Sequence, residues 1–328
     1  MVDDLDIPPS TRLSNRTLAL SVSETPDLAA LGMLDGEDKL FLGAVLTPLV
    51  YSGARVAYGG RIEHPGTTNF TLEMSGQLAE TYRRQDIALG QRPMIHYLRA
   101  ADAHDVGSDK LFSHALRLGS HSEIRLLVDD AVVAAMLPAG GIVDVYCGVK
   151  PPVAVASGAE LAAIPELAVF LAGSADNGLV GMRRAVTRDT DARIIMGGAI
   201  ARTSDGFSGV IAEAIGTLDA DKLLLVVGGV GGSSRDIAAK LGLITEAELV
   251  ARDDAAYVDK DGKPSKQRYD AQLAEIAARR ARFEQALARA GIGDDVRRLA
   301  GSESHVEIGL LIVELLSTCL PPRAENHA

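Results

Sequence analysis

The sequence contains few of the residue types that mark secreted, metal-binding or base-stacking proteins. It has 2 cysteines, no tryptophan and an aromatic content of 4%. Cys147 and Cys319 lie inside apolar runs without metal-ligand spacing, so neither a disulfide framework nor a zinc site is expected. The few aromatic residues leave little material for stacking nucleic-acid bases. Aliphatic side chains must therefore supply most of the core.

Positive charge and long apolar runs are also in short supply. The 328 residues include 33 Lys and Arg against 44 Asp and Glu, a net charge of −11 at pH 7. Such a chain has no global basic field for nucleic acid or an anionic membrane. No run approaches the ~18 apolar residues of a membrane span, and residues 1–9 lack the basic start of a signal peptide. We expect a cytoplasmic protein without a membrane or nucleic-acid partner.

Strand-like and helix-like patterns alternate along the chain. The expected strands are residues 17–23, 55–58, 93–98, 123–128, 193–196 and 223–227. The expected helices include residues 37–52, 67–84, 179–188, 209–218 and 306–319. This alternation predicts an α/β, Rossmann-like fold with a doubly wound, mainly parallel sheet. Ligands of such sheets bind at the carboxyl ends of the strands.

The expected organisation is a polar lead over residues 1–16 and a single domain over residues 17–328. Residues 131–158 show no clear period and are interpreted as irregular or strand-like. Charge and helical spacing over about residues 245–290 predict a helical insertion near the C-terminus. The final helix, 306–319, is apolar on more than one face, which predicts packing against the sheet and homo-oligomerisation.

Glycine pairs follow several of the expected strands, namely Gly59-Gly60, Gly197-Gly198 and Gly228-Gly229. Glycine permits backbone angles closed to other residues, so N–H groups of such turns can face an anion at a helix N-terminus. The run 228–234 could cradle a phosphate, although it lacks the lysine of a P-loop and the spacing of a dinucleotide fingerprint. The alternative is that each pair only makes a tight strand-to-helix turn. Their recurrence favours a ligand site.

A more specific pattern spans residues 178–213. Met182-Arg183-Arg184 lies on a helix, and the strand that follows ends in Gly197-Gly198. The next helix opens with Gly209 and carries Glu213. Together with the Tyr58-Gly59-Gly60 turn, this arrangement resembles the SLOG superfamily. Its members include the lonely-guy phosphoribohydrolases, the Smf-type DNA-processing proteins, and the ligand-sensing domains of melastatin-type TRP channels and Thoeris-type antiviral effectors.

The resemblance implies a Rossmann-like fold that binds a nucleotide-derived ligand. The opening segment 21–28 (SVSETPDL) and the Tyr58-Gly59-Gly60 turn look like the sensor branch rather than the phosphoribohydrolases. Two departures point the same way. Met196 stands where the phosphoribohydrolases have Pro, and extra loop residues 199–205 precede Val210, which stands in place of Thr.

The resemblance supplies the candidate catalytic residues Glu213 and Arg183. A carboxylate near the ribosyl C1′ stabilises an oxocarbenium ion or activates water, and an arginine holds a phosphate. The plain alternatives are a carboxylate favoured by a helix N-terminus and a solvated arginine. The candidate ligand-binding residues lie after strands, in turns and on the neighbouring helix: Ser21, Ser23, Glu24, Gly59, Gly60, Arg61, Arg184, Gly197, Gly198, Gly206, Gly209, Gly228 and Gly229.

The predicted function is binding or sensing of a nucleotide-derived small molecule related to NAD or ADP-ribose. The alternative is a hydrolase or transferase that acts on a nucleotide N-glycosidic bond, and a third possibility is assembly without catalysis. Convergence of Arg183 or Arg184 with Glu213, and with a second carboxylate such as Glu24 or Glu73, would favour chemistry. No cofactor or metal is expected, and His64 is the only histidine placed near the site.

Overall fold

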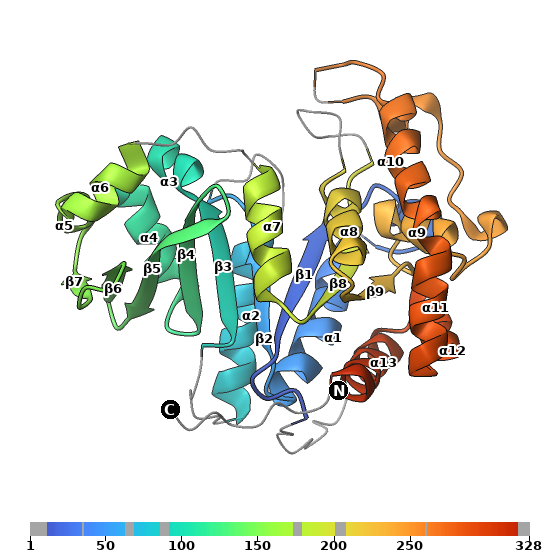
Figure 1. The fold of residues 1–328 in the computed structure, drawn as a ribbon, viewed down its shortest axis with the longest axis horizontal. Coiled ribbons are helices and arrows are strands. Elements are labelled where there is room, and N and C mark those ends of the chain that lie inside the picture. The colour runs from blue at the N-terminus through green and yellow to red at the C-terminus, as the bar shows by residue number, and fades with distance from the viewer. Residues whose placement is uncertain are drawn as a thin grey trace. The chain divides into compact units, whose positions relative to one another are not determined.

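A computed structural model describes residues 12–34, 36–62, 69–85, 92–172, 179–200, 208–259 and 261–320. The fold is mixed α/β with a large, mostly parallel sheet, as the alternating sequence pattern predicted. The chain divides into two compact units (Figure 1). Unit 1 comprises Met1–Arg55 and Asp191–Ala328, and unit 2 comprises Val56–Thr190. The expected single-domain organisation stays a prediction.

Three parallel strands form the centre of unit 1. They are β1 (Thr17–Ser23), β8 (Ala192–Gly197) and β9 (Leu223–Val227), with β8 between the other two. The strands are almost entirely buried, which explains their near-continuous apolar sequences. Their bounds agree closely with the ranges expected from the sequence.

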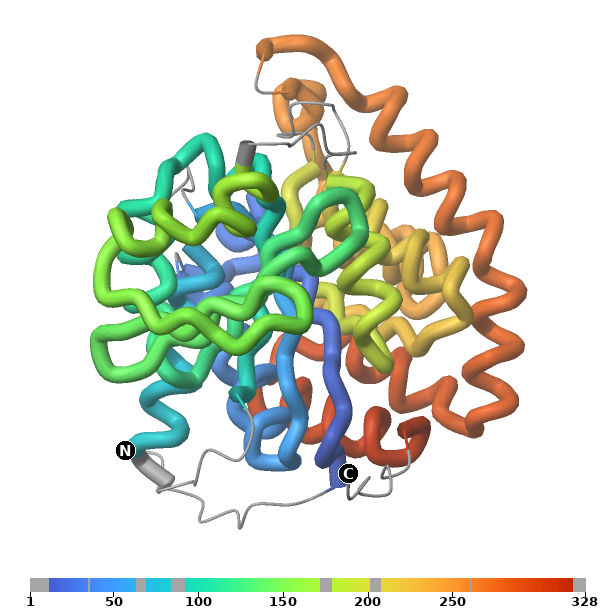
Figure 2. The backbone as a smooth tube through the Cα atoms, turned by 60° about the vertical axis from the view of Figure 1, so that its left-hand side comes forward, coloured from blue at the N-terminus to red at the C-terminus, as the bar shows by residue number. Residues whose placement is uncertain are grey.

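Helices of unit 1 pack around these strands and on one another. They are α1 (Glu37–Tyr51), α8 (Gly209–Asp219), α9 (Gly232–Lys240), α10 (Lys266–Ala278), α11 (Arg280–Ala290), α12 (Gly293–Gly301) and α13 (His305–Cys319). Single turns of 3-10 helix lie at Ala29–Leu31 (η1), Glu246–Glu248 (η2) and Asp254–Tyr257 (η3). The expected helical insertion corresponds to η2, η3, α10 and α11, and α10 packs on both α8 and α9. Figure 2 shows α10 and α11 in orange as consecutive stretches of the tube.

The C-terminal helix α13 packs against β9 and more extensively against α1. A side chain at Gly309 would lie 2.5 Å from the Ala44 carbonyl oxygen, so glycine allows the two helices to approach closely. Ile308 and Ile312 face this interior, whereas Val306 and Leu310 are 69% and 61% exposed. Apolar residues therefore lie on both faces of α13, as predicted.

Unit 2 contains parallel strands followed by an antiparallel meander. Strands β2 (Arg55–Gly59), β3 (Met94–Arg99) and β4 (Ser122–Val128) are parallel. Strands β5 (Ala131–Ala139), β6 (Ile142–Cys147) and β7 (Val153–Val155) continue the sheet antiparallel. The helices are α2 (Phe70–Gln85), α3 (Ala100–Val106), α4 (Ser108–Leu118), α5 (Gly158–Ala162), α6 (Pro165–Ala172) and α7 (Leu179–Asp189).

Two-residue turns explain why residues 131–158 form a meander. Gly140 and Gly141 join β5 to β6 with φ of 56° and 93°, the geometry of a hairpin turn that matches strand twist. Asp129, with φ of 54°, begins the turn from β4 to β5. The sequence expectation of irregular or strand-like structure is thus refined to three antiparallel strands.

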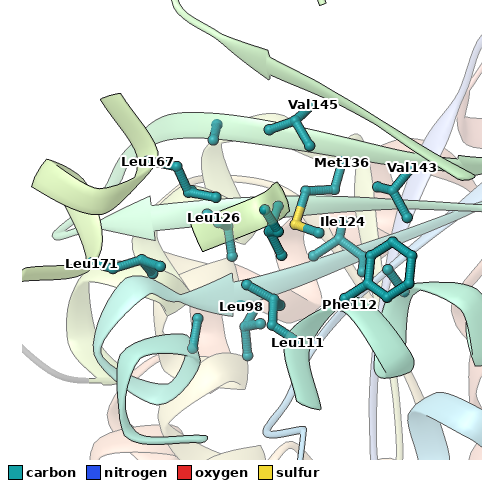
Figure 3. Close-up of a cluster of buried hydrophobic side chains, with 14 of the residues drawn as sticks. Leu98, Leu111, Phe112, Ile124, Leu126, Met136, Val143, Val145, Leu167 and Leu171 are labelled. Atoms are coloured by element: carbon teal, nitrogen blue, oxygen red, sulfur yellow. The ribbon is translucent and has the colours of Figure 1, made fainter. Parts of the chain in front are cut away.

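The meander and the helices beside it share one hydrophobic core with β4. Figure 3 shows Leu111 and Phe112 of α4 pointing toward Ile124 of β4 and Met136 of β5. Leu167 of α6 belongs to the same cluster.

None of the helices in the residues that the structure describes has the length and apolar character needed to span a bilayer.

Candidate functional site

The carboxyl ends of β1 and β8 lie side by side in unit 1. The parallel register places Ser21 beside Ile195 and Ser23 beside Gly197. Because side chains alternate along a strand, Ser21 and Ser23 share one face of the sheet. The helix α8 contacts both strands, and Glu213 lies on this helix. We call the adjacent carboxyl ends of these two strands the β1–β8 edge. Several of the predicted residues lie at this edge or on the helix beside it, within one unit.

The carboxylate of Glu213 is paired with a buried arginine, Arg193, which is not among the site residues predicted from the sequence. Arg193 Nη1 lies 2.9 Å from Glu213 Oε2 and 2.6 Å from Ser21 Oγ, and Arg193 Nε lies 2.8 Å from Thr217 Oγ1. The Ser21 hydroxyl also donates to Glu213 Oε2. The Arg193 side chain is 2% exposed and that of Glu213 is 18% exposed. A buried guanidinium needs such partners, so Glu213 has a structural role whatever it binds.

Arg193 could have been found from its neighbours in the sequence. It lies second in the run Ala-Arg-Ile-Ile-Met, which is otherwise apolar and forms a buried strand. A charged residue in a central strand requires a partner of opposite charge. The sequence does not show which carboxylate supplies it, because the partner lies on α8, 20 residues later.

The Gly197-Gly198 turn packs tightly against the start of α9. The two residues have φ of 64° and 109°, and a side chain at Gly198 would lie 2.1 Å from Ser233 Oγ. The Gly198 N–H donates to the Ser23 carbonyl at 3.2 Å, and the Ala199 N–H donates to Ser23 Oγ at 3.2 Å. The fold thus needs glycine at position 198, and its N–H is used inside the protein.

The α8 N-terminus is joined to α9 and α10. Gly209 is the first residue of α8, and Ser208 precedes it. Ser208 Oγ lies 3.1 Å from Ser233 Oγ, and the Ser208 N–H donates to Gln272 Oε1 at 3.0 Å. Gly206 lies outside the residues that the structure describes. A role in ligand binding stays a prediction for Gly197, Gly198, Gly206 and Gly209.

The Gly228-Gly229 turn is buried against residues 300–302. A side chain at Gly229 would lie 1.9 Å from the Ser302 carbonyl oxygen, and one at Gly228 would lie 2.6 Å from that of Ala300. The packing alone accounts for both glycines, as the tight-turn alternative predicted. Contact of either residue with a ligand stays a prediction.

In unit 2 the Gly59-Gly60 turn is held by a pair of buried histidines. The Gly60 N–H donates to the Tyr97 carbonyl at 3.3 Å. His96 Nε2 lies 3.2 Å from the Gly60 carbonyl oxygen, and His114 Nε2 lies 3.2 Å from His96 Nδ1. Because a carbonyl only accepts, His96 must carry its proton on Nε2, and His114 then donates to Nδ1. His64 lies outside the described residues, so His96 is the histidine found at this turn.

Burial keeps both imidazoles neutral. It lowers the pKa of His96 to about 4, although the hydrogen bond to Gly60 opposes this effect. Burial, followed by the charges of His96 and Arg117, lowers the pKa of His114 to about 3. At neutral pH the hydrogen bonds therefore run in one direction, from His114 to His96 and from His96 to the Gly60 carbonyl oxygen. The sequence pattern does not indicate this pair, because His96 and His114 belong to different elements.

The arginines predicted to hold a phosphate, Arg183 and Arg184, lie on α7 in unit 2, and the predicted ligand-binding residue Arg61 follows β2. Arg183 is partly buried, and Arg184 and Arg61 are exposed. The helix is fixed within unit 2, because a side chain at Gly181 would lie 2.4 Å from the Asp129 carbonyl oxygen. Its C-terminal residue Asp189 accepts a hydrogen bond from Tyr97 Oη at 3.0 Å.

The convergence of these arginines with Glu213 stays a prediction, because Glu213 belongs to unit 1. The same holds for Glu24 and Glu73, which belong to unit 1 and unit 2. Among the residues that the structure describes, no group of three or more His, Cys, Asp or Glu is arranged to hold a metal ion.

The family model described as SLOG cluster2 matches residues 12–128 and 173–282, which is more than half of the chain. The chain belongs to the SLOG family. Comparison with curated proteins and with solved structures gave no match. The SLOG match includes the β1–β8 edge, α7, α8 and α10, and it leaves out residues 129–172, which contain the meander and α5–α6. Membership of the sensor branch stays a prediction for this SLOG protein.

Proposed function

We propose that this SLOG protein binds a nucleotide-derived small molecule related to NAD or ADP-ribose and acts as a ligand sensor. The observation that carries the proposal is the pairing of Glu213 on α8 with Arg193 of β8, beside Ser21 of β1. A carboxylate that stabilises an oxocarbenium ion acts through its negative charge. Here a buried guanidinium compensates that charge, and Ser21 donates to the same oxygen.

The same arrangement suits recognition of ribose. Hydroxyl groups of a sugar donate to a carboxylate without any change of charge, and each such bond contributes about 1 to 3 kcal/mol. Ser23, which is partly exposed, adds a hydroxyl group on the same face of the sheet as Ser21. The resemblance to the sensor branch and the departures at Met196 and Val210 support binding over cleavage.

Thermal unfolding with and without AMP, NAD and ADP-ribose tests the binding proposal. A ligand that binds only the folded protein raises Tm, so at least one of these compounds should do so at millimolar concentration. Glu213→Gln keeps an amide oxygen for Arg193 but removes its counter-charge, so the variant should unfold at a lower temperature than the wild type and show a smaller rise of Tm with the ligand. Absence of any response in the wild type would contradict the proposal.

A specific observation favours nucleotide N-glycosidase activity as a second candidate. Glu213 is 18% exposed although its partner Arg193 is buried, so a ligand at the strand edge could reach it. Chromatography of AMP, NAD and ADP-ribose after incubation distinguishes the two functions. A sensor releases no free base. Adenine or nicotinamide release that falls at least ~100-fold in Glu213→Gln would replace the sensor with a hydrolase.

A further inference from the structure

Four buried polar side chains form one network at the N-terminal end of α9. Asp27 follows β1, Asp236 lies on α9, Arg252 lies between η2 and η3, and Tyr269 lies on α10. The side chains of Asp27, Asp236 and Arg252 are 3%, 5% and 6% exposed, and Tyr269 is fully enclosed. We call these residues the Asp27 network. The sequence pattern does not indicate this network, because its four residues lie on four separate segments.

The guanidinium of Arg252 donates two parallel hydrogen bonds to the carboxylate of Asp27. Arg252 Nε lies 2.9 Å from Asp27 Oδ1, and Arg252 Nη2 lies 2.6 Å from Asp27 Oδ2. Arg252 Nη1 reaches Asp236 Oδ2 at 2.7 Å, and the Tyr269 hydroxyl also donates to Asp236. The Gly232 N–H, the first of α9, donates to Asp27 Oδ2 at 2.6 Å.

Arg252 and Tyr269 keep their protons over the ordinary pH range. Burial acts to lower the pKa of Arg252, but hydrogen bonds and charges from Asp27 and Asp236 outweigh it and raise the pKa. Burial, followed by the charge of Asp236, raises the pKa of Tyr269. Arg252 and Tyr269 therefore act only as donors.

The donors around Asp27 are those that usually hold a phosphate. A helix N-terminus supplies an N–H group and a partial positive charge, and an arginine fork supplies two parallel N–H groups. In this protein both are directed at a carboxylate of the chain itself. The neighbouring N–H groups are also used, because Gly231 donates to the Gly228 carbonyl and Ser233 to the Gly198 carbonyl, each at 3.0 Å.

We propose that Asp27 is a specificity residue whose carboxylate occupies the anion position of α9 and excludes phosphate groups from it. Two carboxylates and one guanidinium leave the Asp27 network with net negative charge, which repels a second anion. A nucleotide-derived ligand then meets this end of the β1–β8 edge through hydroxyl groups. This last consequence rests on the proposed function, whereas the exclusion of phosphate does not.

Phosphate rescue tests the exclusion directly. Asp27→Gly removes the carboxylate and leaves Arg252 and the Gly232 N–H to bind inorganic phosphate. At constant ionic strength, 10 mM phosphate should raise the Tm of Asp27→Gly by about 3 to 5 °C. The wild type should not respond. Asp27→Ser, which leaves a hydroxyl that can accept from Gly232, is a second variant in case Asp27→Gly fails to fold.

Asp236→Asn is the matched control. It removes the other carboxylate of the Asp27 network but leaves Asp27 at the helix end, so phosphate should not stabilise it. The proposal is overturned if phosphate stabilises the wild type through Arg252, so that Arg252→Lys abolishes the effect. It is equally overturned if Asp27→Gly or Asp27→Ser folds and shows no phosphate response.

A nucleotide series connects the exclusion with the ligand. The affinity of AMP relative to adenosine should rise at least 10-fold in Asp27→Ser compared with the wild type, because the variant gains a place for the phosphate. An AMP-to-adenosine affinity ratio that is the same in Asp27→Ser and in the wild type would overturn the inference that the ligand meets this end of the sheet through hydroxyl groups. If neither compound binds the wild type and NAD and ADP-ribose also fail, the proposed function fails, and phosphate rescue still decides the role of Asp27.

Discussion

The two units stabilise their buried polar groups by different chemistry. In unit 1, buried charged side chains pair with each other, Arg193 with Glu213 and Arg252 with Asp27. In unit 2, the Gly60 turn is held by two neutral imidazoles, His96 and His114. A buried ion pair is most sensitive to the loss of one partner, whereas a buried neutral histidine is most sensitive to acid. Mutation and pH therefore probe the two units separately.

The largest expected effect follows removal of the buried arginine. Arg193→Met leaves Glu213 without its counter-charge inside unit 1, which should lower the free energy of unfolding by about 3 to 5 kcal/mol. Chemical denaturation measures the change. The second substitution in Arg193→Met/Glu213→Gln removes the uncompensated negative charge at position 213. The double variant should therefore recover part of the lost stability.

A surface arginine provides the control for this result. Arg279 bridges Asp219 and Glu275, whose side chains are 50% and 63% exposed. Arg279→Met should therefore cost less than about 1 kcal/mol. Equal losses for Arg193→Met and Arg279→Met would contradict the role assigned to Arg193.

Acid should destabilise unit 2 through the histidine pair. The pKa values of about 4 for His96 and about 3 for His114 lie below the ordinary value of 6.5, so between these values the unfolded chain takes up protons that the folded one does not. Stability is thus lost as pH falls from 6.5 toward 4. The loss at pH 5 should be roughly 2 kcal/mol for each histidine.

Denaturation at pH 7 and pH 5 measures this contribution. In His96→Gln/His114→Gln, the difference between the two pH values should shrink by roughly 4 kcal/mol relative to the wild type. His104→Gln, at an exposed position of α3, is the control and should leave the difference unchanged. A double variant with the pH dependence of the wild type would show that the pair is not the source.

Alanine at two glycines should separate rigid from adaptable packing. Gly229→Ala places a methyl group 1.9 Å from the Ser302 carbonyl oxygen, whereas Gly59→Ala places one 2.9 Å from the flexible Met182 side chain. We expect losses of about 1 to 3 kcal/mol for Gly229→Ala and less for Gly59→Ala. Thermal unfolding of both variants in one buffer tests this order, and a reversed order would contradict it.

The smallest effect on folding should come from the exposed face of α13, where the predicted self-association would act. Val306 and Leu310 are exposed, and so is Leu40 on the neighbouring α1. Leu310→Glu should shift light scattering toward the 34.4 kDa monomer and change stability by no more than about 0.5 kcal/mol. Val149→Glu, on a loop of unit 2, is the control. A wild type that is monomeric at every concentration would remove the idea.

The elements of the parallel sheet could be predicted because local patterns determine them. Leu223–Val227 is apolar throughout and Thr17–Ser23 carries only small hydroxyl residues beside its apolar ones, which is typical of short strands covered on both faces. The helices α12, α5 and α6 were missed. Their sequences lie beside segments already interpreted as turns or as irregular structure, and their burial depends on distant partners.

The candidate site could be predicted only at the level of single residues. Ser21 and Ser23 were predicted because they lie at the end of a strand, where ligands of parallel sheets bind, and Glu213 was predicted from the resemblance to the SLOG superfamily. Arg193, Asp27 and Arg252 were not found as partners, since pairing between distant segments leaves no local periodic signal. The glycine pairs do not distinguish a ligand site from a tight strand-to-helix turn, because close packing needs the same residue, and their contact with a ligand stays a prediction.

The internal segment that the SLOG match leaves out, residues 129–172, contributes to the hydrophobic core of unit 2. Met136, Val145 and Leu167 lie within residues 129–172 and share a core with Leu111 and Phe112 of α4. A chain without this segment would expose part of the apolar surface of those two side chains to water. Gain or loss of the segment in evolution thus requires matching changes on α4, and excision in the laboratory requires polar substitutions at Leu111 and Phe112.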